Sequence, residues 1–171
     1  MAFVPPDYRR ALSTRSTYVE NVLIHRLVAE LASALWTQDP EKELGIFNSE
    51  VDESGFDLVL HCDGKLRYIQ IKQAHGDGRT NRFAVRSSFS VMPGSCVVVI
   101  VHSMEKLEIN HYLFYGGSSA SDPMSSIDAY PPMRGRRNRE GNPMIRGHYR
   151  EVPRNRFEKV GIDGLLRKLF G

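Results

Sequence analysis

An acid, an amide and an amine lie close together in two neighbouring segments of this sequence. Asp57 belongs to the first segment, and Gln70 and Lys72 belong to the second. Carboxylate and amide oxygens are ligands for a hard cation such as Mg²⁺ or Mn²⁺, and the main-chain carbonyl of Ile71 is a further candidate ligand. Such a cation lowers the pKa of a bound water, while Lys72 could orient that water or neutralise charge growing on phosphoryl oxygens. These residue types therefore point to hydrolysis of phosphodiester bonds.

A predicted β-hairpin brings these residues together. Residues 56–62 and 65–73 have strand composition, and the Asp-Gly dipeptide between them is typical of a two-residue turn. With this turn, Asp57 lies directly across from Gln70. Because side chains alternate along a strand, both residues share a face with Lys72. The opposite face is expected to be apolar and to consist of Phe56, Leu58, Leu60, Ile69 and Ile71.

The same arrangement has a purely structural explanation. Asp57 and Lys72 could form an ordinary solvated ion pair at the end of a strand, and such pairs are common. His61 lies on the same predicted face but near the turn, roughly 13 Å along the strand from Asp57. We therefore do not expect His61 to act as a general base.

Hydrophobic periodicity predicts the elements that must position this hairpin. Residues 14–36 carry apolar side chains at the three- and four-residue spacing of an amphipathic helix. The segment from Cys96 to Val101 is apolar at every position, which predicts a central strand covered on both faces. Five strands of one sheet are expected, at residues 46–47, 56–62, 66–73, 96–102 and 111–115. The expected fold class is therefore α/β, with a central mixed β-sheet flanked by helices.

The rest of the chain is predicted to add few regular elements. Residues 116–148 are rich in Gly, Ser, Pro and Arg and have no periodicity, so we expect a long basic loop there. Asp163 is expected to cap a short C-terminal helix that docks through Leu165, Leu166, Leu169 and Phe170. The 171 residues are enough for one domain, spanning residues 1–171. Cys62 and Cys96 are expected to be free thiols.

The sequence also predicts the compartment. The longest apolar run has six residues, whereas a membrane span needs about 20. The first residues lack the basic and apolar regions of a secretory signal. We therefore expect no membrane association and a cytoplasmic location.

The order of these elements resembles the PD-(D/E)XK nuclease superfamily and, more narrowly, its Mrr-like restriction endonuclease branch, in which Gln replaces the second acid. The resemblance covers roughly residues 14–115 and includes Asp57 after Glu53-Ser54-Gly55-Phe56, then Gln70-Ile71-Lys72 on the next strand. It implies a restriction-endonuclease-like fold, metal ligation by Asp57 and Gln70, and a catalytic role for Lys72. Two features depart from the family pattern: no proline precedes Asp57, and residues 74–93 lack a clear helix and begin as a loop.

The third acidic ligand is open between Glu20 and three acids nearer the hairpin. By the resemblance, Glu20 is the helix glutamate that holds metal-bound water, and its place beside the apolar stripe of the first helix allows it to point toward the sheet. Glu20 could equally be a solvated glutamate that the helix dipole favours. The alternatives nearer the hairpin are Glu50, Asp52 and Glu53, which are also typical of a turn leading into a strand.

A basic segment suggests a polyanionic partner. Residues 134–157 hold eight arginines and two glutamates, a local charge of +6 in a chain whose net charge is +3. We expect these arginines to contact the phosphates of DNA rather than to read its bases, because irregular spacing does not hold bidentate geometry. A solvated loop that only aids solubility is the alternative. The predicted nucleic-acid-binding residues are Arg134, Arg136, Arg137, Arg139, Arg146 and Arg150.

Together these features predict a metal-dependent endonuclease that acts on DNA, with Asp57, Gln70, Lys72 and Glu20 as its catalytic residues. Because an amide adds no charge to a cation site, the alternative is a catalytically weak or inactive module of the same fold that binds nucleic acid or a partner protein. A homodimer is compatible with cleavage of both strands, which needs two sites.

Overall fold

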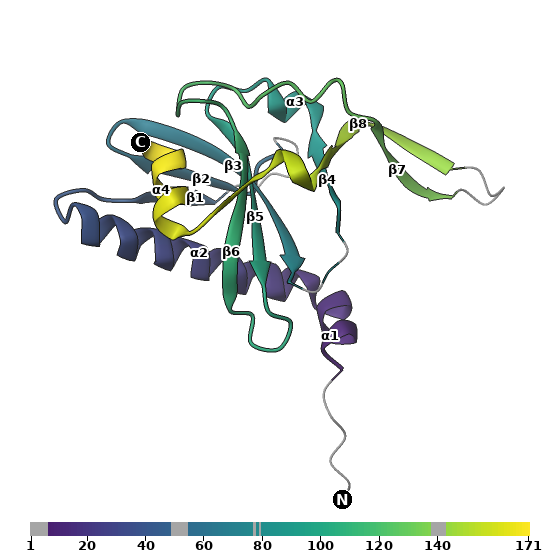
Figure 1. Cartoon of the computed structure of the whole chain (residues 1–171), viewed down its shortest axis with the longest axis horizontal. Helices are drawn as coiled ribbons and strands as arrows, with labels where there is room; N and C mark the ends of the chain where they lie inside the picture. Colours follow the sequence, from purple (N-terminus) through teal and green to yellow (C-terminus); the bar gives the residue numbers. More distant parts are fainter. Residues whose placement is uncertain (1–6, 49–54, 77, 79, 138–142) are drawn as a thin grey trace, which may run out of the picture.

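A six-stranded mixed β-sheet forms the centre of the computed structural model (Figure 1). The structure describes residues 7–48, 55–76, 78, 80–137 and 143–171. Neighbouring strands lie in the order β1-β2-β3-β5-β6-β9, with β3 and β5 parallel and every other pair antiparallel. The strands are β1 (Gly45–Asn48), β2 (Leu58–Cys62), β3 (Lys65–His75), β5 (Ser95–His102), β6 (Ile109–Gly116) and β9 (Glu158–Val160). The five predicted strands are thus confirmed, and β9 is added at one edge.

The predicted hairpin register is confirmed from Leu58 to Cys62. Leu58 pairs with Ile69 and Cys62 pairs with Lys65. Asp63 and Gly64 have φ angles of 50° and 75°, the positive values that a type I′ turn requires at both positions. The turn chemistry therefore determines which residues of β2 and β3 lie opposite each other.

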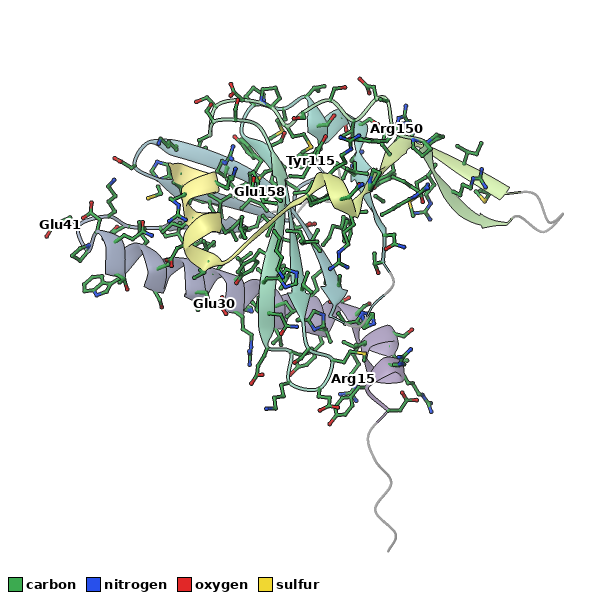
Figure 2. The ribbon with its side chains drawn as sticks, in the orientation of Figure 1. Arg15, Glu30, Glu41, Tyr115, Arg150 and Glu158 are labelled. Atoms are coloured by element: carbon green, nitrogen blue, oxygen red, sulfur yellow. The ribbon has the colours of Figure 1, made fainter. Side chains whose placement is uncertain are left out.

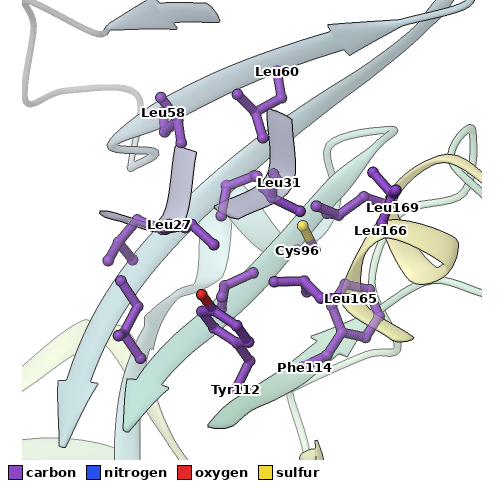
Figure 3. Packing of buried hydrophobic residues seen from close by; sticks show 14 of the residues in the cluster. Leu27, Leu31, Leu58, Leu60, Cys96, Tyr112, Phe114, Leu165, Leu166 and Leu169 are labelled. Carbon is purple, nitrogen blue, oxygen red and sulfur yellow. The ribbon is translucent and has the colours of Figure 1, made fainter. Parts of the chain in front are cut away.

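Helices cover one face of the sheet. The amphipathic helix α2 (Ser16–Gln38) lies along this face, as predicted, and follows a short unpredicted helix, α1 (Tyr8–Thr14), that Asp7 caps through Arg10 N. The C-terminal helix α4 (Ile162–Phe170) packs on the same face (Figure 3). The cluster between them includes Leu27, Leu31, Leu58, Leu60, Cys96, Phe114, Leu165 and Leu169.

A second sheet, rather than a long helix, packs on the opposite face. Its strands lie in the order β4-β8-β7, with bounds Arg82–Arg86, Pro143–Pro153 and Pro132–Arg137. Phe83, Val85 and Val152 pack against the alternate face of β5 together with Phe89 of the short helix α3 (Ser87–Ser90). A 3-10 turn, η2 (Arg154–Arg156), joins β8 to β9. All eight residues of β5 are buried between the two layers, which confirms its predicted central place.

Three expectations about local structure are wrong. Residues 116–148 are not irregular throughout, because β7 and the start of β8 form a hairpin that is anchored by distant residues of β4. Asp163 lies in the first turn of α4 but does not cap it, since Gly161 occupies the N-cap position. Phe56 does not share the face of Leu58, because β2 begins only at Leu58 and the alternation of side chains does not extend before it. It lies on the side of the second sheet, with its ring centroid 5.3 Å from that of Tyr68.

Two cations of β3 fasten the last helix to the sheet. Lys65 Nζ donates to Phe170 O at 2.6 Å, and the fully buried Arg67 donates from Nη2 to Lys168 O at 2.7 Å. Arg67 also donates from Nη1 to Ser119 O at 3.0 Å. Cations near the carbonyl end of a helix are stabilising, because these carbonyls lack partners within the helix.

Two further expectations can be compared with the structure. Cys62 and Cys96 are free and buried, and burial raises the pKa of Cys96 to about 12. Within the described part of the chain, no helix combines the length and apolar character needed to cross a bilayer.

Candidate functional site at the edge of strand β3

The main chain of β3 positions Asp57. Asp57 N donates to Ile69 O at 2.9 Å, and Asp57 Oδ2 accepts a 2.6 Å hydrogen bond from Ile71 N. β2 begins one residue later, so the carboxylate lies where β3 continues beyond its partner strand. The preceding Phe56 ring packs on Tyr68 and Phe89, which anchors this segment to the second-sheet side. Asp57 is thus held at an edge of β3 where no strand of the described residues pairs with it beyond Leu58.

The Ile71 carbonyl faces the same edge as Asp57. A strand residue directs its N–H and C=O toward the same neighbouring strand. Ile71 N donates to Asp57, so Ile71 O also points to the side of β3 where the carboxylate lies. The Asp57 carboxylate and the Ile71 carbonyl therefore face the same side of β3.

Gln70 supplies a buried oxygen that has no hydrogen-bond partner among the described residues. Its side chain is 5% exposed, and within the described residues its Oε1 has no hydrogen-bond partner. Asp57 bonds to the main chain of Ile69 and Ile71, the two residues on either side of Gln70. Leaving a buried amide oxygen unpaired costs about 1–3 kcal/mol. An electropositive group at this position would remove that cost.

The structure brings Glu20 and Lys72 to one pocket, but Asp57 and Gln70 do not line it. Glu20 belongs to α2, on the face of Ile71, whereas strand alternation places Lys72 on the face of Gln70. Both reach a pocket of about 230 Å³. Its lining residues are Glu20, Leu23, Ile71, Lys72, Gln73 and Ile100. The predicted catalytic residues thus lie around one stretch of β3, from both faces and from its edge.

The oxygen donors present fit a hard divalent cation. Mg²⁺ is commonly bound by one or two carboxylates together with water and substrate phosphates. Asp57, Ile71 O and Gln70 Oε1 supply one carboxylate and two neutral oxygens, and the unpaired Gln70 oxygen is the observation that favours this assignment. Among the described residues, no three His, Cys, Asp or Glu side chains form a metal-binding group. Glu50, Asp52 and Glu53, the alternative acids, lie outside the described residues.

A histidine pair missed by the sequence analysis lies at the carboxyl ends of the parallel strands. His75 of β3 pairs with His102 of β5, and their rings stack with centroids 6.5 Å apart. His102 is 2% exposed, its Nδ1 lies 2.9 Å from Ser103 O, and burial lowers its pKa. Both histidines line a small pocket with Leu12 and Gln73, and Gln73 also lines the pocket of Glu20. Ligands commonly bind outside the carboxyl ends of parallel strands. The two histidines are neighbours only because β3 and β5 pair in parallel. The sequence alone does not indicate this pairing, because it depends on the order of the strands in the sheet.

The arginine segment adopts regular structure, contrary to expectation. Arg134 and Arg146 are exposed on β7 and β8, and Arg150 is half-buried at the base of the ribbon, with Nη1 2.7 Å from Gly147 O (Figure 2). Arg136 and Arg137 belong to β7, whereas Arg139 lies outside the described residues. The premise that these arginines are spaced irregularly along a loop is therefore wrong for the five that lie on strands.

Comparisons with protein-family models, with curated proteins and with solved structures found no match for this chain.

Proposed function

We propose that this chain is a metal-dependent endonuclease that hydrolyses phosphodiester bonds of DNA, with a restriction-endonuclease-like fold of the PD-(D/E)XK type. The observation that carries the proposal is the buried Gln70 oxygen, which has no partner in the described structure, on the residue between the two to which Asp57 bonds, Ile69 and Ile71. An ordinary ion pair between Asp57 and Lys72 would not account for that oxygen. A cation held by Asp57, Gln70 and Ile71 O would.

The surrounding side chains have complementary roles. Mg²⁺ or Mn²⁺, when bound, would polarise a phosphoryl oxygen and activate water. Asp57, fixed through its bond to Ile71 N, presents one carboxylate oxygen in a defined orientation. The Lys72 ammonium would neutralise charge that develops on the phosphoryl oxygens. Glu20, in the pocket that Lys72 also lines, would accept a hydrogen bond from the attacking water and orient it.

A plasmid cleavage assay tests this function. Purified chain is incubated with supercoiled and linear duplex DNA in Mg²⁺, Mn²⁺ or EDTA, alongside Asp57→Asn and Lys72→Met. We expect cleavage only with metal and a loss of at least about 100-fold in each variant, since each removes an interaction with the developing charge.

Lys65→Met is the matched control, because Lys65 lies on the same strand but donates to the carbonyl of Phe170. It should cleave as the parent chain does. Cleavage that survives in both Asp57→Asn and Lys72→Met would overturn the proposal.

A second function is a binding module that has the same fold but no catalysis. It is favoured by the amide at Gln70, which adds no charge to the cation site, and by the lack of a three-acid group among the described residues. Calorimetric titration with Mn²⁺ separates the two functions. No heat at millimolar Mn²⁺, with DNA affinity retained, would favour the module, whereas Mn²⁺ binding that disappears in Asp57→Asn would favour the enzyme.

A further inference from the structure

The β7–β8 hairpin is an arm that projects away from the rest of the molecule (Figure 1). β8 pairs with β4 from Tyr149 to Pro153, but before Tyr149 it pairs only with β7. The two-stranded part of β8 is six residues long, or roughly 20 Å at about 3.3 Å per residue. Val152 at its base is fully buried, whereas Ile145 is 66% exposed on the same strand. The arm therefore has a fixed base and an uncovered outer part.

Both faces of the arm carry a cation and an apolar side chain. Met133 pairs with Arg146 on one face, and Arg134 pairs with Ile145 on the other. Met144, next to Ile145, is 57% exposed. A ribbon that rests on a protein body normally alternates an apolar inner face with a polar outer face. This arm has no such division, so both of its faces are suited to contact with a partner that surrounds it.

Arginines outnumber acids on the described strands of the arm. Among the described residues, no salt bridge involves Arg134, Arg146 or Arg150. The one acid of the described arm strands, Glu151, lies at the base and pairs with Arg82 at 3.5 Å. The outer arm is therefore cationic, and its partner is expected to carry negative charge on both sides of the ribbon.

We propose that the β7–β8 arm enters the major groove of duplex DNA; this inference rests on the proposed function and names double-stranded DNA as the substrate class. Two phosphate backbones flank the groove, so Arg134 and Arg146 on opposite faces can each reach one of them. Met144 and Ile145 then contact base edges, where the thymine methyl group offers an apolar surface.

The dimensions favour this groove over other nucleic-acid surfaces. A ribbon with side chains on both faces is about 10 Å thick, which fits the roughly 12 Å major groove of B-form DNA and not the roughly 6 Å minor groove. The major groove of A-form RNA is deep and narrow and does not admit such an element. Single strands are usually bound through stacked aromatic rings, and the described outer arm, residues 132–137 and 143–148, contains no Phe, Tyr or Trp.

The test measures binding without cleavage. The Lys72→Met chain is titrated in EDTA against fluorescein-labelled 24-base-pair DNA, RNA of the same sequence and single-stranded DNA, and anisotropy is recorded at several salt concentrations. We expect duplex DNA to bind at least about tenfold more tightly than either alternative. Netropsin, which occupies the minor groove, should leave this affinity unchanged, whereas 7-deazapurines, which alter the major-groove edge, should reduce it.

Two double variants separate charge from apolar contact. Arg134→Gln with Arg146→Gln should lower the slope of log affinity against log salt by about 1.8, or about 0.9 for each phosphate that the arm no longer neutralises. Met144→Ser with Ile145→Ser should weaken duplex binding about tenfold and leave that slope unchanged. The matched control is Arg9→Gln with Arg10→Gln, which removes two exposed arginines from α1 and should change neither quantity. Far-ultraviolet circular dichroism should show unchanged folding in all three.

The outcomes distinguish this inference from the proposed function. Duplex binding that is lost in the arm variants, without cleavage by the parent chain, would support the arm and overturn the endonuclease. Equal affinity for single and double strands, or duplex binding that both arm variants retain, would overturn the arm whatever the chain cleaves. Binding to vesicles rich in phosphatidylserine, with none to DNA, would overturn it in favour of a membrane surface.

Discussion

Strand β3 has a buried polar residue in each half, Arg67 near its start and Gln70 three positions later, on opposite faces. Arg67 donates from its two Nη atoms to carbonyls of Ser119 and Lys168, and its guanidinium lies 5.9 Å from the centre of the Phe114 ring. Its Nε has no partner in the described structure, as is also true of Gln70 Oε1. An unpaired buried atom alone therefore does not distinguish a functional residue from a structural one. The difference lies in the other contacts.

Arg67 joins two distant segments to the sheet, whereas the polar groups around Gln70 gather at an edge with pockets beside it. The first half of β3 uses its cations to fasten α4. The second half carries Gln70, Lys72 and His75 beside an acid and next to the carboxyl end of a parallel strand. Substitutions on the two halves should therefore have opposite effects on stability and on metal response.

The largest effect is expected for Arg67→Met. This change removes two hydrogen bonds from a charged guanidinium, to the carbonyls of Ser119 and Lys168, and each bond of this kind contributes about 1.5–3 kcal/mol. We expect a loss of about 3–4 kcal/mol, or roughly 10 °C in Tm for a chain of this size. Urea unfolding followed by circular dichroism measures it. A loss below about 1 kcal/mol would show that the contacts of Arg67 in the first half of β3 do not stabilise the fold more than the polar groups of its second half.

Gln70→Met is the matched change in the second half of β3. It preserves volume and removes a buried amide with an unpaired oxygen, so stability in EDTA should rise by about 1 kcal/mol. Mn²⁺ should raise the Tm of the parent chain by mass action, and this increment should be absent from Gln70→Met. A thermal shift assay with and without Mn²⁺ measures both quantities. An equal Mn²⁺ increment in the two chains would exclude Gln70 as a ligand.

A smaller effect is expected from pH, through the histidine at the carboxyl end of β5. Burial lowers the pKa of His102 below its unfolded value near 6.5, so the unfolded chain takes up a proton before the folded chain does. Stability should therefore be full above about pH 7 and should fall as the pH drops from about 6.5 through the folded pKa. Urea midpoints at pH 7.5 and 5.5 should differ less in His102→Phe than in the parent chain. Burial also lowers the pKa of His111, so a smaller difference between the two urea midpoints should remain in His102→Phe.

The smallest effect is expected for Lys65→Met. The Lys65 ammonium donates to Phe170 O and to Gly171 O at the C-terminal end of α4. Cation contacts of this kind contribute about 0.3–1 kcal/mol when they are partly exposed. Urea unfolding of Lys65→Met should therefore show a loss below about 1 kcal/mol. A loss as large as that of Arg67→Met would mean that the difference in exposure between Lys65 and Arg67 does not determine how much each cation stabilises the fold.

The sequence was most informative where local chemistry determines the structure. Asp63 and Gly64 specify the turn, and the turn sets the register from Cys62–Lys65 to Leu58–Ile69. The all-apolar run of β5 likewise required cover on both faces. These features depend on residues within a few positions of one another, so their prediction needed no knowledge of the rest of the fold.

Prediction failed where the partner lies far along the chain. The alternation of Phe83 and Val85 is a local signal for β4 that was not used in the prediction. The prediction of β8 had no such signal, because β8 is stabilised by pairing with β4, and the Arg82–Glu151 contact between them joins residues 69 positions apart. The pairing of His75 with His102 depends on strand order, because β4 leaves the sheet between them. The place of Glu20, on the face opposite Gln70, depends on which side of the sheet α2 covers.

The bond from Arg67 to Lys168 joins residues 101 positions apart, and the bond from Lys65 to Phe170 joins residues 105 positions apart. Contacts this distant can form only after a long stretch of chain has been ordered, and proteins dominated by them fold slowly. On a ribosome, the buried guanidinium of Arg67 has no acceptor in α4 until residue 168 has emerged. Folding of the sheet should therefore be completed only after α4 has emerged, and the nascent chain should need protection from aggregation until α4 docks.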